Sequence, residues 1–205
     1  MLGHLQVPRP VVVLGSRQPL AHLDAGALAR DDVAVLRRRG GGGAVLLGPE
    51  DCWMELWLPA DSPVAGRDVR RTACIVGEWW QRAAAGLGIS TDVHRAGLVD
   101  GDQGAIACFA GLGPGELTAS GNKLLGISQW RSREGTLVSA VVAAHAPSGL
   151  AAYLSEGAGP TPALLAATSL FDVAPDVDAH MLAAAVTAVI VDAEPGIGVE
   201  PSAFR

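Results

Sequence analysis

The chain has little of several features, and each scarcity argues against a class of protein. It has three cysteines in 205 residues and no CxxC pair, so neither a disulfide-stapled fold nor a zinc cluster is indicated. No apolar run approaches the roughly 20 residues of a membrane-spanning helix, and no basic start precedes an apolar stretch as in a secretory signal. We therefore expect a cytoplasmic protein with no membrane span and no metal site, whose cysteines are small buried apolar residues.

Positive charge is also scarce. The formal net charge is -6, which is the wrong sign for a surface that neutralises the phosphates of a nucleic acid. Apolar residues make up 49% of the chain and charged residues 18%, which is typical of a chain that buries a core. The length suits one domain, so we expect a single domain over residues 1–205 that does not bind nucleic acid.

Lysine is the scarcest charged residue. Of 15 lysines and arginines, Lys123 is the one lysine. An ammonium and a guanidinium are not interchangeable, so an arginine-biased chain retains lysine where arginine would not serve. Asn122 is likewise the one asparagine, so a drift in composition explains the count equally well.

The order of the predicted elements favours an α+β fold, with a mixed or antiparallel β-sheet flanked by helices. The pattern predicts strands at 11–14, 33–36, 44–47, 53–58, 93 with 96–99, 105–109, 117–120, 124–129 and 137–144, an extended piece ending at 170, and a surface loop at 157–162. It predicts helices at 21–29, 68–87, 150–154 and 178–191. The turn formers at 48–51 suggest that the strands on either side of them form a hairpin.

A run of glycines follows three arginines between two predicted strands. Gly40–Gly43 lets the backbone approach a ligand closely and turn its amides toward an anion, and Arg37–Arg39 supplies bidentate donors for a phosphate or carboxylate. A flexible, solvated loop is the alternative interpretation of this segment.

The lone lysine follows a predicted tight turn, Ser120–Asn122. In a regular strand Lys123 would share a face with Leu125 and Ile127, where an ammonium is costly unless it meets an anion such as an acyl carboxylate or a phosphate. Alternatively, the lysine lies at the strand end and extends to water.

The two segments together resemble one enzyme family. Residues 37–45 are similar to the RRxxGGGAV segment of lipoate–protein ligases, and residues 121–129 to their GxKxxGxxQ-type segment. Shorter likenesses occur at 15–18, 87–89, 107–109, 116–117 and 168–170. The sequence therefore resembles the catalytic domain of the biotin and lipoate ligase superfamily over roughly 11–191.

That resemblance implies a two-step ligase. Lipoate or a related medium-chain fatty acid would react with ATP, used with Mg²⁺, and the acyl group would pass to a lysine of a lipoyl-acceptor domain protein. No tightly bound cofactor is implied. The resemblance implies that Lys123 is catalytic and also binds substrate. The other residues that it implies for the substrate and ATP site are Arg37, Gly41, Gly42, Gly43, Ala44 and Val45. We expect Lys123→Ala to abolish acyl transfer and to leave the fold intact.

The chain departs from the family pattern in three places. Leu47-Gly48 stands where His-Asp is usual, and Leu137–Ala140 stands where a histidine segment is usual. The N-terminal edge of the domain is expected to be shortened, with no C-terminal accessory domain. A second subunit or accessory domain is therefore a further expected partner.

Two alternatives keep the fold but change the activity. An octanoyltransferase would take its acyl group from a carrier-protein thioester without ATP. All three cysteines precede Lys123, whereas the family's cysteine nucleophiles follow the lysine, so this route would be direct transfer. A degenerate domain that binds an acyl group or a lipoyl domain without catalysis is the second alternative. Biotin ligases match less well, because their glycine- and arginine-rich signature differs.

Overall fold

The larger of two sheets forms the centre of the molecule. The structure is a computed structural model that describes residues 1–66, 68–158 and 166–200. Within these residues, seven strands run in the order β10-β1-β5-β9-β8-β7-β6. They are β1 (Leu2–Leu5), β5 (Cys52–Pro59), β6 (Asp92–Val93), β7 (Leu117–Ala119), β8 (Asn122–Arg131), β9 (Gly135–Val142) and β10 (Val199–Glu200). β1 pairs with β10 in parallel, and the other neighbours are antiparallel, which confirms the predicted α+β fold with a mixed sheet.

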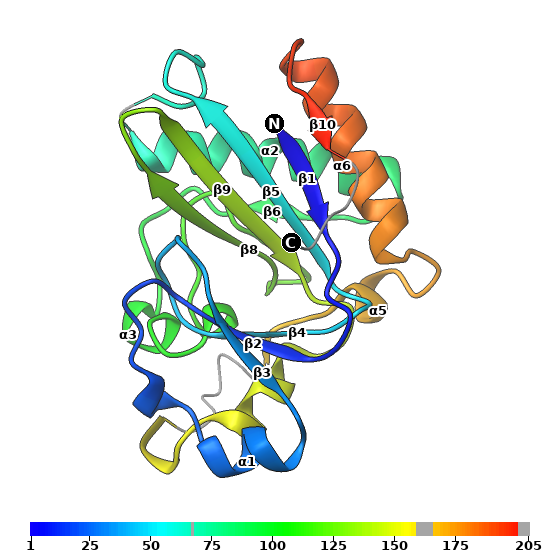
Figure 1. Cartoon of the computed structure of the whole chain (residues 1–205). Coiled ribbons are helices and arrows are strands. Elements are labelled where there is room, and N and C mark those ends of the chain that lie inside the picture. The colour runs from blue at the N-terminus through cyan, green and yellow to red at the C-terminus, as the bar shows by residue number, and fades with distance from the viewer. Residues whose placement is uncertain (67, 159–165, 201–205) are drawn as a thin grey trace.

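A smaller sheet packs on one face of the larger one. Its order is β3 (Ala34–Arg37), β2 (Val11–Leu14), β4 (Val45–Leu47), with β2 parallel to β3 and antiparallel to β4. The predicted hairpin between 44–47 and 53–58 is wrong, because β4 pairs with β2 whereas β5 pairs with β1 and β9. The turn between β4 and β5 therefore carries the chain from one sheet to the other (Figure 1).

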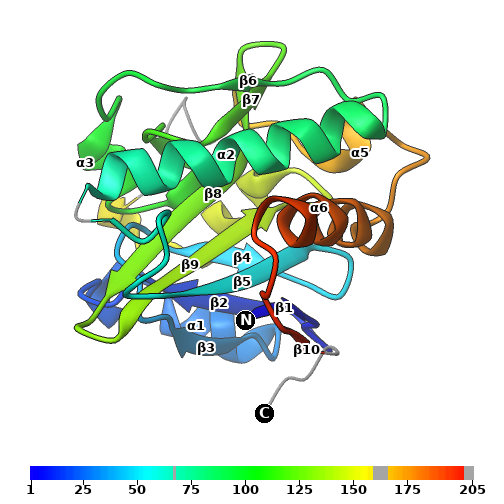
Figure 2. The same ribbon diagram turned by 90° about the horizontal axis from the view of Figure 1, so that it is seen from above.

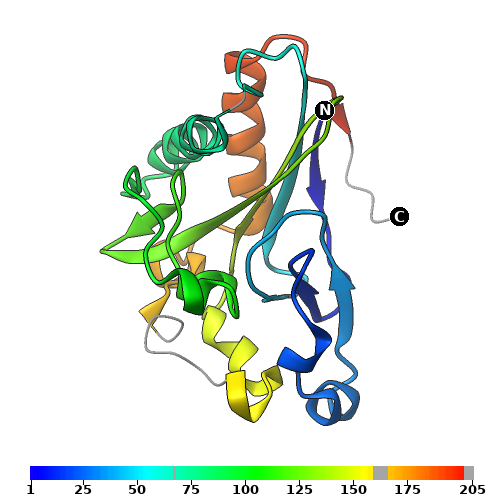
Figure 3. The same ribbon diagram turned by 90° about the vertical axis from the view of Figure 1, so that its left-hand side faces the viewer.

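Two long helices cover the opposite face of the larger sheet. They are α2 (Val69–Gly86) and α6 (Ala179–Ala193), which confirm the helices predicted at 68–87 and 178–191. Asp68 and Asp178 cap their N-termini through side-chain acceptors, as aspartate commonly does. Figures 2 and 3 show the resulting layers: α2 and α6 on one side of the larger sheet, and β2, β3 and β4 on the other.

Among the described residues, the remaining helices are short. They are α1 (Ala25–Arg30), α3 (Gly101–Gly104), α5 (Leu170–Val173), and the 3₁₀ turns Leu20–His22, Cys108–Ala110, Pro147–Tyr153 and Glu156–Ala158. The strand predicted at 105–109 is wrong: this apolar segment leaves α3 and enters a 3₁₀ turn, and Ala107 alone bridges to Ala44. Of the strand predicted at 93 with 96–99, Val93 lies in β6, whereas the second part is wrong, because Val99 alone forms a bridge there, to Leu112. The helix predicted at 150–154 lies in a 3₁₀ turn, and α5 begins at Leu170, where an extended piece was expected to end. The loop predicted at 157–162 lies largely outside the described residues.

Strand β5 separates two hydrophobic cores. Its even-numbered residues, Cys52 to Leu58, pack under α2 and α6, whereas Trp53 joins the core beneath the smaller sheet. This alternation follows from the two-residue period of a strand. Among the described residues, no helix is both long and apolar enough to cross a membrane.

Helix α2 lies in close contact with the loop that precedes β7. A Cβ added at Gly77 would lie 1.9 Å from the Gly115 carbonyl oxygen, and one added at Gly115 would lie 2.2 Å from that of Ala73. Gly115 also has a φ of +85°, which disfavours any side chain. These two glycines let the loop from Gly113 to Glu116 lie directly on the helix.

This contact predicts different effects for two glycines of one helix. We expect Gly77→Ala to lower the free energy of unfolding by about 1–3 kcal/mol, because the methyl group would overpack against the loop. Gly86→Ala is the control, since a Cβ there meets no atom within 4 Å; stability should be unchanged or raised by up to about 1 kcal/mol. Urea unfolding of both variants measures this. Equal effects at the two positions would contradict the close contact.

Candidate functional site

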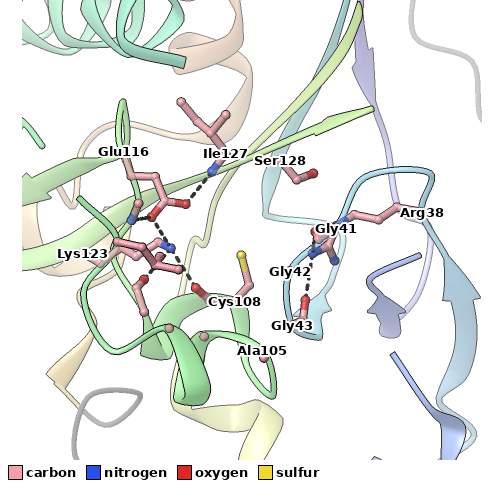
Figure 4. A pocket seen from close by; sticks show the side chains of 15 residues that line it. Arg38, Gly41, Gly42, Gly43, Ala105, Cys108, Glu116, Lys123, Ile127 and Ser128 are labelled. Carbon is pink, nitrogen blue, oxygen red and sulfur yellow. Dashed lines mark hydrogen bonds and ion pairs between the residues drawn. The ribbon is translucent and has the colours of Figure 1, made fainter. Parts of the chain in front are cut away.

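One cavity brings the lysine and the glycine loop together. It has a volume of about 290 Å³ and is lined on one side by Lys123 and Glu116, and on the other by Arg38 and Gly41–Gly43. Figure 4 shows these two groups facing each other, with Cys108 between them. The two segments that stood out in the sequence thus form opposite walls of a single site.

An irregular register aims Lys123 into this cavity. On β7 and β8, Thr118 pairs with Lys123 but Leu117 pairs with Leu125, so β8 contains one extra residue at this point. Such a bulge changes the direction of a side chain. A Cβ added at Gly126 would lie 3.9 Å from the Lys123 Nζ, which places the lysine on the side of Gly126. The expectation that Lys123 shares a face with Leu125 is therefore wrong.

The ammonium of Lys123 is buried and fully hydrogen-bonded. It donates to the carbonyl oxygens of Cys108 and Gly111 at 2.7 and 2.8 Å, and its Nζ lies 2.6 Å from the Glu116 Oε2. The side chains of Lys123 and Glu116 are each 6% exposed. Three acceptors match the three N–H donors of an ammonium, so the lysine is held in one position. The alternative of a lysine extending to water is thereby excluded.

Glu116 also lies in the site, although the sequence motifs did not mark it as a site residue. Its Oε2 accepts from the Gly113 N–H at 2.6 Å and its Oε1 from the Ile127 N–H at 2.9 Å. The carboxylate is thus fixed by backbone donors as well as by Lys123. The available signal was an acid in the Gly-rich turn ahead of the lone lysine, but only the fold shows that both are buried together.

Arg38 shapes the glycine loop on the other wall. Its guanidinium donates to the carbonyl oxygens of Gly41 and Gly43 at 2.6 and 2.9 Å, and to that of Val13 at 3.2 Å. Burial lowers the pKa of Arg38, although an arginine remains protonated at neutral pH. Gly42 adopts a φ of +90°, a conformation that suits glycine. Arg38 therefore holds the glycine loop in shape through its hydrogen bonds, and it also places a positive charge beside the cavity.

The other candidate residues lie around this loop in different roles. Arg37 points away from the cavity, because its guanidinium donates to the carbonyl oxygens of Gly15, Ser16 and Gln18. Ala44 is fully buried, and its backbone hydrogen-bonds to Ile106 and Cys108. This backbone pairing fixes the glycine loop to the segment that also holds Lys123.

A second, smaller chamber continues from the main cavity. The two share Arg38, Cys108, Ile127 and Ser128. The rest of its wall comes from Val13, Val45, Leu47, Trp53, Gly126, Ser139 and Val141. Its volume is about 20 Å³. Leu47 and Ser139, which belong to the two segments that depart from the family pattern, both line this inner chamber.

The cysteines differ in their surroundings. Cys52 is buried as expected, and burial raises the pKa of its thiol. Cys74 and Cys108 are only half-buried, so the expectation of three buried cysteines is wrong. Cys108 lines both cavities, which the order of residues along the chain did not indicate. Within the described residues, no three metal-ligating side chains come together.

Comparison with known proteins identifies the family. The profile of the lipoyl protein ligase A/B catalytic domain matches residues 3–187. The chain belongs to this family. A search of curated proteins finds no match.

Solved lipoate ligases share the fold of this family member. A lipoate protein ligase-type protein from Thermoplasma acidophilum, solved with lipoic acid, superposes with a TM-score of 0.76 at 15% identity, over 98% of this chain and 76% of that one. A bipartite ligase from the same organism gives 0.73 at 15% identity, over 93% and 69%. A lipoate-protein ligase A with bound ATP gives 0.76 at 16% identity, over 93% and 71%. At these identities the likeness establishes the fold.

The buried ion pair makes Lys123 a stability determinant. We expect Lys123→Met to lower the free energy of unfolding by about 3–5 kcal/mol, because it leaves the Glu116 carboxylate buried beside only two N–H donors. The expectation that replacing Lys123 leaves the fold untouched is revised for this reason. Urea unfolding measures the loss.

The double variant Lys123→Met/Glu116→Gln provides the control for this pair. It should recover at least about 1 kcal/mol relative to Lys123→Met, because it removes the unpaired charge. A single variant as stable as the wild type would mean that Glu116 gains no stability from the lysine.

Proposed function

We propose that this domain is an ATP-dependent acyl–protein ligase. A carboxylate oxygen of the acid attacks the α-phosphorus of ATP, bound with Mg²⁺, and pyrophosphate leaves. The amine of an acceptor lysine then attacks the acyl carbon of the adenylate and AMP leaves. The family membership supports the reaction class. Lipoate or a medium-chain acid, and a lysine of a lipoyl domain, are the substrates that the family resemblance suggests.

One observation carries this proposal: Lys123 and the glycine loop form opposite walls of the same cavity. Negative charge grows on the phosphate oxygens as the phosphorus becomes five-coordinate. A fixed ammonium stabilises these oxygens more in the transition state than in the ground state, because their negative charge is larger there. Gly41–Gly43 line the facing wall, and without a Cβ their backbone leaves room for an anion to approach. We therefore assign Lys123 to the reacting oxygens and the glycine loop to the phosphates.

The contacts of Lys123 set a condition on this mechanism. All three ammonium hydrogens have protein acceptors, at Cys108, Gly111 and Glu116. A substrate oxygen must therefore share or replace one of these acceptors. Cys108 is half-buried and lines both cavities, Gly111 lines only the main one, and Glu116 is anchored by two N–H groups. We propose that the Cys108 contact is the one exchanged.

Pyrophosphate release tests the reaction. With ATP, Mg²⁺ and lipoate or a straight-chain acid, we expect pyrophosphate to form. Lys123→Arg should lower its rate by about 10²-fold, because the larger planar cation keeps the charge beside Glu116 but not the position. Arg9→Lys is the control: Arg9 is exposed and pairs with Asp32 on the surface, so its rate should stay within about twofold.

Circular dichroism must show that both variants are folded before their rates are compared. Pyrophosphate release by Lys123→Arg at the wild-type rate would remove Lys123 from the mechanism. If the folded wild type releases no pyrophosphate with any acid, the ligase proposal fails.

An acyltransferase is the second candidate, and the position of Cys108 favours it. Its side chain lies where the two cavities meet, beside the residues that would hold an acyl carbonyl. A thiolate there could attack a carrier-protein thioester, release the carrier thiol, and pass the acyl group to an acceptor amine. The alternative of direct transfer without a covalent intermediate remains for the same cavity.

ATP dependence separates the two candidates. With an octanoyl carrier-protein thioester as donor, the ligase should transfer nothing in the absence of ATP. The covalent transferase should work without ATP and form an acylated Cys108, which mass spectrometry detects in the wild type and not in Cys108→Ala. ATP-independent transfer that persists in Cys108→Ala would indicate the direct route.

A further inference from the structure

We propose that three apolar residues on the larger sheet, beside the glycine loop, form the surface on which the acceptor protein docks. These residues are Trp57, Leu137 and Trp130, and they are called the aromatic patch below. The inference rests on the proposed function, because it assumes that the acyl group passes to a lysine of a protein domain. It adds the surface that this domain contacts.

The aromatic patch is one row of residues across three neighbouring strands. Trp57 on β5 pairs with Leu137 on β9, which in turn pairs with Trp130 on β8. Residues that pair across strands point to the same face of a sheet, so the three side chains lie together. The centroids of the two indole rings are 6.4 Å apart. The two-residue period of β5 places the patch on the same face as Trp53, the face that the smaller sheet partly covers.

The fold leaves this row half-buried instead of enclosing it. Among the described residues, neither hydrophobic core includes a member of the patch, whereas the other tryptophans, Trp53, Trp79 and Trp80, all lie in a core. Figure 1 shows the reason: β2, β3 and β4 lie over the lower part of the larger sheet, and the turn between β8 and β9 lies at the upper left, beyond them. Large apolar side chains gathered outside the core are typical of an interaction surface, and tryptophan is common at the centre of protein interfaces.

Two contacts join the patch to the wall of the catalytic cavity. Ser128 lines that cavity, and Trp130 follows it two residues later on the same face of β8. A Cβ added at Gly40 would lie 2.6 Å from the Ser128 Oγ, so the start of the glycine run lies directly on this strand. The guanidinium of Arg39 lies 4.8 Å from the centre of the Trp130 ring. A protein on the patch therefore contacts the loop that faces Lys123, which suits a substrate whose amine must enter the cavity.

Charge indicates the kind of partner. Arg39 is exposed, and none of the ion pairs among the described residues involves it. A guanidinium that lies over an aromatic ring still presents its N–H donors at its edge, where a carboxylate of the partner can accept them. The net charge of -6 disfavours a nucleic acid or an anionic membrane. The occupant is therefore a folded domain that presents an exposed lysine beside carboxylates and an apolar surface.

Separating the two half-reactions tests the patch. Acyl transfer to an apo-lipoyl domain requires docking, whereas pyrophosphate release from ATP and lipoate without that domain does not. We expect Trp130→Thr and Trp57→Thr each to raise the KM for the domain by about tenfold or more and to leave pyrophosphate release within about twofold of the wild type. Threonine is chosen because it retains the preference for a strand.

Titration calorimetry of the apo-lipoyl domain without ATP measures docking independently of the ligase reaction. The wild type should bind, and both tryptophan variants should bind about tenfold more weakly or worse. Arg39→Gln should weaken binding by about three- to tenfold and reduce its dependence on salt, because it removes the charge at the surface.

Phe171→Ala is the matched control. Phe171 is also an exposed aromatic residue, but its N–H donates to the Ala144 carbonyl, just beyond the end of β9 that is opposite the patch. This variant should retain the wild-type affinity and KM for the domain. Circular dichroism must show that each variant is folded, and either tryptophan variant suffices for the test if the other does not fold.

The outcomes distinguish the docking surface from the ligase reaction. Wild-type affinity for the domain in every folded variant of the patch overturns the docking surface, and so does a wild type that does not bind the domain. A dimer of this chain that Trp130→Thr separates, seen by light scattering, also overturns it, because a second copy would then occupy the patch. Binding that depends on the patch, in a wild type that releases no pyrophosphate, supports the docking surface and refutes the ligase.

Discussion

The buried ammonium of Lys123 is the constraint on which the arrangement of the site depends. A charge removed from water must be surrounded by acceptors, and here these come from the 3₁₀ turn that begins at Cys108, from Gly111 and from Glu116. The chain from Cys108 to Glu116 therefore wraps around one amine. Gly113 and Ile127 then fix Glu116 through their N–H groups, so the wall of the cavity forms a single hydrogen-bonded unit.

The opposite wall is tied to the same unit by backbone contacts. Ala44 pairs with the segment around Ala107, and a Cβ at Gly43 would lie 2.5 Å from the Ala107 nitrogen. The glycine run thus serves close packing as well as ligand approach. Because one short segment contacts both the lysine and the glycine loop, backbone hydrogen bonds together with the side chains of Arg38 and Lys123 set the width of the cavity.

The two sheets contribute different parts of the site. The larger sheet with α2 and α6 forms a closed core and supports β8, which carries Lys123. The smaller sheet contributes apolar side chains that meet Trp53 and the inner chamber.

The sequence alone determined the class of fold, the two long helices and the pair of segments that form the site. Apolar periodicity marked α2 and α6, and a turn of glycine and asparagine marked the start of β8. Local patterns carry such information because period and turn chemistry act over a few residues.

Only the tertiary structure decided which side chains meet. The bulge that turns Lys123, the burial of Glu116 against it, the separation of β4 from β5, and the position of Cys108 all depend on strand pairing between distant segments. The tertiary structure also places Arg38, rather than Arg37, beside the cavity. Arg37 is the last residue of β3 and Arg38 follows it, and the two guanidinium groups bind different carbonyl groups. Pairing and packing between distant residues have no signature in a local pattern, which is why these contacts required the folded chain.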